Sequence, residues 1–296
     1  MNKNFDCINK IISNKVISEK ENYALMIGLN PSKGARSPSL WNKFFNQSGI
    51  NAEMYPADLE SEEKLIDLLK ILETDNNFIG GAVAAPYKQT VYNFFKQNCD
   101  DLSSKASFAS NNIFRNNKGI LTVANTDAAA AVLSIDNEIK SYPNILLLGM
   151  GSTGRAIAAI LKDKCELTVW NRSKNDTLEI FLQRNKKIQS IECLPCSLAS
   201  FDLIINATLV GSNQFSFLDT ILIGDELVQT AKKSCLFFDI NYDPPFSNHS
   251  DLFMKNGNKC LNGIRMNLLQ ACIAISNCYL NFTPEEIENI LAKNLL

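Results

Sequence analysis

Residues Gly149–Gly154 read Gly-Met-Gly-Ser-Thr-Gly, a spacing that suits the phosphates of a dinucleotide. The first glycine permits a tight turn, the second lets the backbone approach a pyrophosphate, and the third lets a helix pack closely on a strand. The apolar run Ile145–Leu148 precedes this turn and the helical stretch Arg155–Leu161 follows it. A pyrophosphate there would face the N-terminus of a helix. We therefore predict a dinucleotide site, with a purely structural glycine turn as the alternative.

The residues after the next predicted strand, Leu167–Trp170, indicate which dinucleotide binds. An NAD site usually carries an acidic residue at this place, but this chain has Asn171-Arg172-Ser173. An arginine can form forked hydrogen bonds to a 2′-phosphate, and Lys174 adds positive charge, so the pattern favours NADP. The alternative is that Arg172 is an ordinary solvated charge. The expected cofactor-binding residues are Gly149, Gly151, Ser152, Thr153, Gly154, Asn171, Arg172 and Ser173.

The composition narrows the class of partner. The chain has 29 Lys and Arg against 31 Asp and Glu, and this near-balance argues against a nucleic-acid or membrane-surface partner. No stretch approaches the roughly 18 apolar residues of a membrane helix, and the start, Met1–Asp6, has no apolar signal-peptide core. We expect a small-molecule substrate and a monomer or homodimer.

The cysteines indicate a reducing compartment. Nine cysteines are scattered along the chain, an odd number that suits reduced thiols in the cytosol better than a disulfide framework. Cys193 and Cys196 have the spacing of a zinc knuckle, but the chain has no second pair and its one histidine, His249, is distant in sequence. We therefore expect an ordinary loop there and no metal site.

The N-terminal part of the chain alternates strand-like and helix-like stretches. Strands are predicted at Tyr23–Leu29 and Phe78–Val83, and an amphipathic helix at Glu62–Leu72. Another helix should begin with Ser37 as its cap and Pro38 as its first residue, and stop near Gly49. Such alternation predicts an α/β sheet.

A second run of strands follows a boundary that we place between Ala128 and Tyr142. The chain ends in two predicted helices, for the second of which Thr283 and Glu286 form a capping box. The predicted strands are Ile145–Leu148, Leu167–Trp170, Leu203–Ala207 and Leu236–Ile240, and the helices are Met266–Cys278 and Pro284–Lys293.

Several motifs resemble the signature sequences of the shikimate dehydrogenase family, in the family's order and over about residues 23–280. They are Pro31–Pro38 with Trp41-Asn42, Val83–Lys88, Asn125–Asp127, Gly149–Ala156 with Asn171–Ser173, Ile205–Gly211, Asp239–Pro244 and Gly263…Gln270. The resemblance implies an α/β substrate-binding catalytic domain at residues 1–130 plus 264–296 and a Rossmann-type NADP domain at residues 140–263. The C-terminal helices would pack back on the first domain, and substrate and nicotinamide would lie between the domains.

The activity implied by the resemblance is reversible hydride transfer between NADP(H) and a cyclic hydroxy or keto acid, as in the shikimate pathway of aromatic amino acid biosynthesis. Oxidation of an alcohol needs a hydride acceptor, which the cofactor supplies, and a group that takes the hydroxyl proton. The family pattern assigns the proton transfer to Lys88 and its carboxylate partner to Asp127. Without the resemblance, both would be read as surface charges.

The same resemblance indicates a substrate pocket. Its expected substrate-binding residues are Ser37, Asn111, Tyr242 and Gln270, with packing or helix-surface residues as the less favoured alternative for Tyr242 and Gln270.

The departures from the family pattern cluster in this pocket. Ala35, Ala82 and Ala84 stand where the family has a Ser, an Asn and a Thr, and Ala128 replaces a Gly. The first three changes each remove a hydrogen-bonding side chain, which predicts a different or more loosely held substrate. Arg36 either supplies a replacement carboxylate contact or points to solvent.

Two other functional classes remain open from the sequence. One is a family member that binds NADP and a ligand as a sensor with little turnover, which the intact Lys88 and Asp127 disfavour. The other is a different NADP-linked Rossmann enzyme, such as a methylene-tetrahydrofolate dehydrogenase-like protein, which Asn125–Asp127 and Gln270 disfavour.

Overall fold

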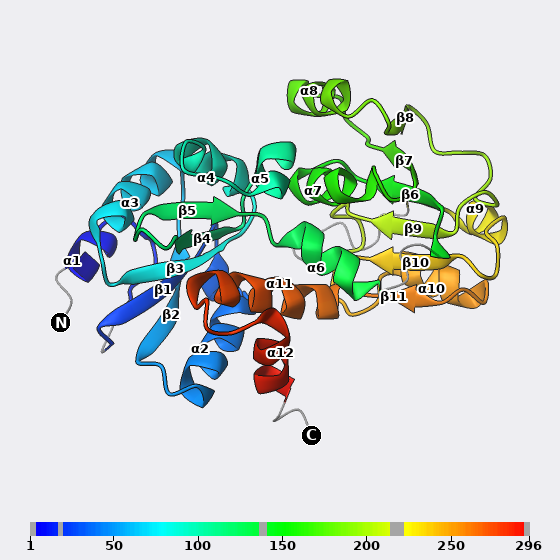
Figure 1. The fold of residues 1–296 in the computed structure, drawn as a ribbon. Coiled ribbons are helices and arrows are strands. Elements are labelled where there is room, and N and C mark those ends of the chain that lie inside the picture. Colours follow the sequence, from blue (N-terminus) through cyan, green and yellow to red (C-terminus); the bar gives the residue numbers. More distant parts are fainter. Residues whose placement is uncertain (1–3, 17–19, 136–140, 214–221, 293–296) are drawn as a thin grey trace. The chain divides into compact units, whose positions relative to one another are not determined.

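The chain folds into two compact units, each built on one β-sheet (Figure 1). The computed structural model describes residues 4–16, 20–135, 141–213 and 222–292. The first unit comprises the described parts of residues 1–126 and 268–296, and the second unit comprises those of residues 127–267.

The sheet of the first unit has the strand order β2-β1-β3-β4-β5. Its strands are β1 (Asn22–Gly28), β2 (Ala52–Asp58), β3 (Phe78–Val83), β4 (Asn112–Arg115) and β5 (Leu121–Ala124). The first three are parallel, because helices connect them, whereas β4 and β5 form an antiparallel hairpin that extends the sheet from β3. The hairpin turns at Gly119, whose φ of +75° favours glycine.

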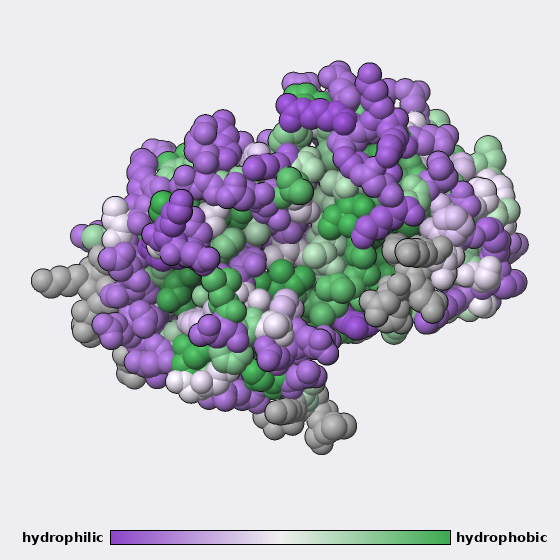
Figure 2. All heavy atoms as spheres, viewed as in Figure 1, coloured by the Kyte–Doolittle hydropathy of each residue, from purple (hydrophilic) through white to green (hydrophobic). Residues whose placement is uncertain are grey.

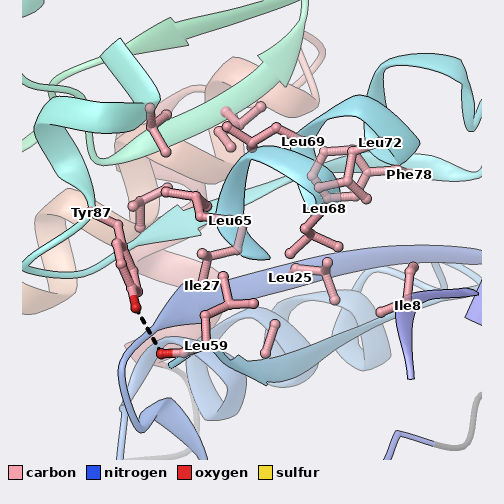
Figure 3. Close-up of a cluster of buried hydrophobic side chains, with 14 of the residues drawn as sticks. Ile8, Leu25, Ile27, Leu59, Leu65, Leu68, Leu69, Leu72, Phe78 and Tyr87 are labelled. Carbon is pink, nitrogen blue, oxygen red and sulfur yellow. Dashed lines mark hydrogen bonds between the residues drawn. The ribbon is translucent and has the colours of Figure 1, made fainter. Parts of the chain in front are cut away.

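Helices cover both faces of this sheet. They are α1 (Asn4–Ile8), the short 3-10 turn η1 (Pro31–Lys33), α2 (Ser37–Gln47), α3 (Glu62–Thr74), α4 (Lys88–Phe95), α5 (Leu102–Ser107), the end of α11 (Gly263–Cys278) and α12 (Pro284–Ala292). Side chains of β1 alternate between two cores, as a strand buried on both faces requires. Leu25 and Ile27 join a core with α1, α3 and α4 (Figure 3), whereas Ala24 and Met26 join one with α2, α11 and α12.

The second unit contains a wholly parallel sheet with the strand order β11-β10-β9-β6-β7-β8. Its strands are β6 (Asn144–Leu148), β7 (Glu166–Trp170), β8 (Gln189–Ile191), β9 (Leu203–Asn206), β10 (Leu236–Asp239) and β11 (Cys260–Leu261). Read from β8, this is the Rossmann order, in which the chain reverses direction across the sheet between β6 and β9. Ligands of such sheets bind at the carboxyl ends of the strands beside that reversal.

The helices of the second unit are α6 (Asp127–Ser134), α7 (Ser152–Leu161), α8 (Asp176–Arg184), α9 (Asp225–Gln229), α10 (Asn248–Lys255) and the start of α11. A hydrophobic core includes Leu146 and Leu148 of β6, Val228 of α9 and Phe253 of α10. The rings of Phe237 and Phe253 stack there with centroids 4.2 Å apart. This packing fixes β6, and therefore the turn that follows it.

Most of the predicted elements are confirmed to within a few residues. The Thr283–Glu286 capping box is present, with Thr283 N–H donating to Glu286 Oε2 at 2.8 Å and Glu286 N–H donating to Thr283 Oγ1 at 3.2 Å. Helix α12 ends at Ala292 among the described residues, and Lys293 lies outside them. Gly49 follows the end of α2 with a φ of +66°. These local signals therefore specify helix ends as expected.

The prediction that Ser37 caps α2 is wrong. Arg36 occupies the cap position with helical backbone angles, and Ser37 is the first helical residue. The N–H of Leu40, which a Ser37 cap would have bonded, instead donates to the carbonyl of Arg36 at 3.2 Å. The helix therefore begins one residue earlier than predicted.

In the described residues no helix has both the length and the apolar character to cross a membrane. Hydrophilic side chains cover much of the face drawn in Figure 2.

Candidate active site

The glycine turn joins β6 to α7 and has the geometry that its sequence requires. Gly149 has a φ of +91°, and a Cβ on it would lie 2.9 Å from the carbonyl carbon of Ala207 in the loop after β9. A Cβ on Gly154 would lie 1.9 Å from the carbonyl oxygen of Gly149, so α7 packs directly against the turn. At Gly151, by contrast, a Cβ would meet no atom within 4 Å. The turn is thus tightly packed at its two ends and open in the middle, where a ligand could approach the backbone.

Two side chains hold the middle of this turn. Asn171 Oδ1 accepts a hydrogen bond from Met150 N–H at 2.9 Å, and Asn171 Nδ2 donates to the carbonyl of Ser173 at 2.5 Å. Arg155 Nη1 donates to the carbonyl of Met150 at 3.0 Å, and burial lowers the pKa of Arg155 to about 10. Sequence reasoning missed this role for Arg155, because an arginine on a helix is normally exposed.

A pocket of about 340 Å³ lies beside the turn in the second unit. Its lining comes from Met150, the loop after β7, α8 and β8, and it includes Asn171, Arg172 and Lys174. Arg172 and Lys174 are exposed, and Lys174 Nζ pairs with Glu192 Oε1 at 2.5 Å. Hydrogen bonding to Glu192 raises the pKa of Lys174. The pocket thus presents Arg172 and Lys174 next to the glycine turn, and its lining also includes the carboxylates of Glu179 and Glu192, the second of which pairs with Lys174.

Asp127 lies at the start of α6 and is nearly buried, with 6% of its surface exposed. The Thr153 hydroxyl, in the first turn of α7, donates to Asp127 Oδ2 at 3.0 Å. Ser152, the first residue of α7, is half-buried. The glycine-rich segment and the carboxylate are therefore in direct contact within the second unit, which the sequence did not reveal.

The two residues before Asp127 are held firmly in the first unit. Thr126 N–H donates to Asn111 Oδ1 at 2.8 Å, and Asn111 Nδ2 donates to Thr126 Oγ1 at 3.0 Å. Asn125 N–H donates to Asp101 Oδ2 at 3.0 Å, while its side chain donates to the carbonyl of Ala109 at 3.0 Å. Asn111 is thus buried in a network that holds the chain leading to Asp127. Asp101 also caps α5, a role that its sequence context did not single out.

Lys88 is half-buried and begins α4 in the first unit. The preceding residue, Tyr87, is buried, and its hydroxyl donates to the carbonyl of Leu59 at 2.7 Å (Figure 3). The carbonyl of Lys88 accepts a hydrogen bond from Ser110 N–H at 2.9 Å. Hydrogen bonds of Tyr87 and of the Lys88 carbonyl therefore hold the chain on both sides of the Lys88 side chain.

Comparison with known proteins agrees with this geometry. Residues 27–111 match the family model of the shikimate dehydrogenase substrate binding domain. The chain is 30% identical to a shikimate dehydrogenase (NADP⁺) of Pyrococcus furiosus over 194 residues, which cover 62% of this chain and 66% of that protein. It is 25% identical to the enzyme of the same name from Methanococcus vannielii over 281 residues, covering 88% and 93% of the two chains. The chain belongs to the shikimate dehydrogenase family.

The fold comparison extends over nearly the whole chain. A shikimate 5-dehydrogenase from Thermus thermophilus, solved in complex with NADP(H) and shikimate, superposes with a TM-score of 0.75. The match covers 92% of this chain and 99% of that one at 20% identity. The predicted fold class, an α/β substrate unit with a Rossmann-type unit, is therefore confirmed.

The departures from the shikimate dehydrogenase pattern lie together in the first unit. Ala82 belongs to the core that α2, α11 and α12 form on the sheet, and Ala35 and Ala84 pack against the same core. Ser37 is buried at the start of α2, and Gln270 is buried on α11, next to Ala271 of this core. The three alanines thus adjoin one apolar cluster, and Ser37 and Gln270 lie on two helices, α2 and α11, that contribute to it.

Tyr242 is half-buried in the loop after β10 in the second unit. The buried carboxylate of Asp239 anchors this loop, accepting hydrogen bonds from Ser247 Oγ at 2.6 Å, Asn241 N–H at 3.0 Å and Asn206 Nδ2 at 3.1 Å. Burial raises the pKa of Asp239, and the hydrogen bonds oppose this rise. Asp239 therefore ties the loop that carries Tyr242 to the end of β9.

Proposed function

We propose that this chain is an NADP-dependent oxidoreductase that transfers hydride reversibly between NADP(H) and a cyclic hydroxy or keto acid, such as shikimate and 3-dehydroshikimate or a close analogue. The observation that carries the proposal is the pocket of Arg172 and Lys174 beside the open glycine turn, in a member of the shikimate dehydrogenase family. Activity on a CH–OH group follows from the family, whose members that match this chain bear the name shikimate dehydrogenase (NADP⁺).

The residues of the second unit fit NADP. The open backbone at Gly151 and the N-terminus of the ten-residue helix α7 suit a pyrophosphate. Arg172, with Lys174 beside it, suits a 2′-phosphate, and no acidic residue occupies the position of Asn171. Bound NADP⁺ would accept the hydride, and NADPH would donate it. Gly149, Gly154, Ser152, Thr153 and Ser173 complete the proposed cofactor site.

Proton transfer is proposed for Lys88, with Asp127 as the carboxylate of the catalytic pair. In the oxidative direction the Lys88 amine takes the hydroxyl proton, and in the reductive direction the ammonium returns it. The fixed backbone on both sides of Lys88 supports the assignment, because a proton-transfer group must be held in position. Asp127 is almost buried and hydrogen-bonded, as a preorganised carboxylate should be.

The substrate is proposed to be less hydroxylated than shikimate, or to carry its acid group in a different place. Ser37, Asn111, Tyr242 and Gln270 remain as proposed substrate-binding residues. Ala35, Ala82 and Ala84 present methyl groups to an apolar cluster where the family pattern has hydrogen-bonding side chains. A pocket with fewer donors and acceptors favours a ligand with fewer polar groups, since each unmatched polar group costs binding energy.

We also infer that the protein acts in the cytosol, as a monomer or homodimer. Its nine cysteines are all free thiols, which supports a reducing compartment.

The proposed function is tested by a panel of cyclic hydroxy acids that differ in hydroxylation and in the position of the carboxylate. Each is offered with NADP⁺ and with NAD⁺, and reduction is followed by the absorbance of the reduced nicotinamide. We expect turnover with NADP⁺ on at least one member, and its loss in Lys88→Ala. Tight NADP binding without turnover on any member would identify a sensor instead. Preference for NAD⁺ would refute the cofactor assignment.

A further inference from the structure

A side-chain hydrogen bond links the glycine-rich segment to the proposed catalytic carboxylate. Thr153 lies between Gly151 and Gly154 and is the second residue of α7, and its hydroxyl donates to Asp127 Oδ2 at 3.0 Å. Asp127 is the first residue of α6, and α6 and α7 pack against each other within the second unit. The two residues are 26 positions apart in sequence, so tertiary packing brings them together.

We propose that Thr153 is a positioning residue, whose hydroxyl orients the carboxylate of Asp127 for catalysis. This inference rests on the proposed function, in which Asp127 belongs to the catalytic pair. It also gives the Thr153 hydroxyl a partner inside the protein, and a cofactor phosphate would approach the backbone of this turn at Gly151.

The chemistry of the two side chains suits this role. Threonine is branched at Cβ, which restricts its χ1 angle and so aims the hydroxyl in one direction. A hydrogen bond to an ionised carboxylate is shorter and stronger than one between neutral groups. Because Asp127 is almost buried, water is a poor substitute for a lost protein donor. The Thr153 hydroxyl therefore restricts the rotation of the Asp127 carboxylate.

The position of Thr153 couples two parts of the site. The first turn of α7 is where a pyrophosphate would contact the helix N-terminus, and the same turn carries the hydroxyl that holds Asp127. A cofactor that orders this turn would also order the carboxylate. We therefore expect loss of the hydroxyl to reduce turnover much more than cofactor affinity.

The test compares Thr153→Val with Thr153→Ser in the full chain. Valine keeps the branched shape without the donor, so kcat should fall about tenfold or more, while the KM and Kd for NADP⁺ change less than about threefold. Serine restores the donor and should recover most of the rate. Thr177→Val is the matched control, since Thr177 is also the half-buried second residue of a helix, α8. It should leave kcat unchanged.

A double-mutant cycle assigns the effect to Asp127. In an Asp127→Asn background, Thr153→Val should lower the residual kcat by less than about twofold, because the carboxylate it positions is gone. The proposal would be overturned if Thr153→Val lowered kcat equally in both backgrounds or kept full activity. A loss of NADP⁺ affinity as large as the loss of kcat would also overturn it.

Urea unfolding of the same four proteins, the wild type, the two single variants and the double variant, tests this inference independently of the proposed function. Coupling between the two substitutions in the unfolding equilibrium constant should be about fivefold or more if the hydrogen bond holds Asp127. A wild type that is inactive on every substrate would refute the proposed function, and this coupling would still decide whether Thr153 holds the carboxylate. Additive effects on unfolding would exclude that role.

Discussion

Asn171 Oδ1 accepts a hydrogen bond from the backbone N–H of Met150 at 2.9 Å, which fastens the loop after β7 to the middle of the glycine turn. The same side chain donates to the carbonyl of Ser173 at 2.5 Å and so shapes the segment that carries Arg172. One amide thus supports both proposed phosphate-binding parts of the cofactor site. It can do so only because an amide offers an acceptor and a donor at once.

Replacing Asn171 should separate these two contributions. Asn171→Ala removes both hydrogen bonds, and we expect the affinities for NADP and NAD to fall together by about two- to tenfold. Asn171→Asp keeps the acceptor for Met150 but places a carboxylate beside the 2′-phosphate, so NADP should lose more affinity than NAD. Fluorescence titration of each variant with both cofactors measures the effect. Equal losses in the aspartate variant would contradict this account.

Arg172→Ala should weaken the binding of NADP alone. A charge-assisted hydrogen bond to the 2′-phosphate contributes about ten- to a hundredfold in affinity, whereas NAD has no such phosphate. The NADP preference of the wild type should also decline at high salt, because Arg172 is exposed. Titration by calorimetry, with Arg184→Ala on α8 as the control, tests this. Equal affinities of the wild type for NADP and NAD would contradict the proposed contact between Arg172 and the 2′-phosphate.

Lys88→Ala should lower kcat by about 10²–10⁴-fold and change KM little, since general acid–base catalysis acts in the transition state. Asp127→Asn should also lower kcat. Lys96→Ala, an exposed lysine at the other end of α4, serves as the control and should leave the rate unchanged. Steady-state kinetics on whichever substrate proves active provide the measurement. Near-normal turnover of Lys88→Ala would mean that another group transfers the proton.

Restoring two hydrogen-bonding side chains should improve the use of shikimate. Ala35→Ser with Ala84→Thr returns a hydroxyl at each position, and we expect kcat/KM for shikimate to rise at least about tenfold. The KM for NADP⁺ should stay constant, because both alanines lie in the first unit. Ala85→Ser, at an exposed neighbouring position, is the control. A wild-type kcat/KM already near ~10⁶ M⁻¹s⁻¹ would contradict the altered pocket.

The single histidine makes stability depend on pH. His249 is 2% exposed, its Nε2 accepts from Leu222 N–H at 2.7 Å, and burial lowers its pKa from 6.5 to about 4. Between these values the unfolded chain is protonated while the folded chain stays neutral. The contribution of His249 to the free energy of unfolding should therefore fall by about 3 kcal/mol as the pH drops from 6.5 to 4.

Urea unfolding at several pH values, compared with His249→Gln, isolates this contribution. Glutamine can accept the same hydrogen bond but does not titrate in this range, so its stability should vary less with pH. The lone imidazole also gives one set of histidine resonances in the proton NMR spectrum. A resonance that titrates near pH 6.5 in the folded protein would refute the prediction.

There are physical reasons why some strands could not be predicted from the sequence. Strand β2 contains Pro56 and polar residues, a pattern that argues against a central strand; β2 forms at the sheet edge, where a proline is tolerated. The four-residue strands β4 and β5 are too short to show periodicity, and they are strands because they pair with β3 and with each other. Such pairing is a property of the assembled sheet.

The sequence alone determined the local structural features of this protein. The glycine turn after β6, the Arg172 segment after β7 and the capping box at Thr283 are each specified by neighbouring residues, because backbone conformation and helix ends depend on local sterics and hydrogen bonds. The tertiary structure decided which distant groups meet. Asp127 contacts Thr153 and Asp239 contacts Asn206 only because packed helices and paired strands bring residues far apart in sequence within hydrogen-bonding distance.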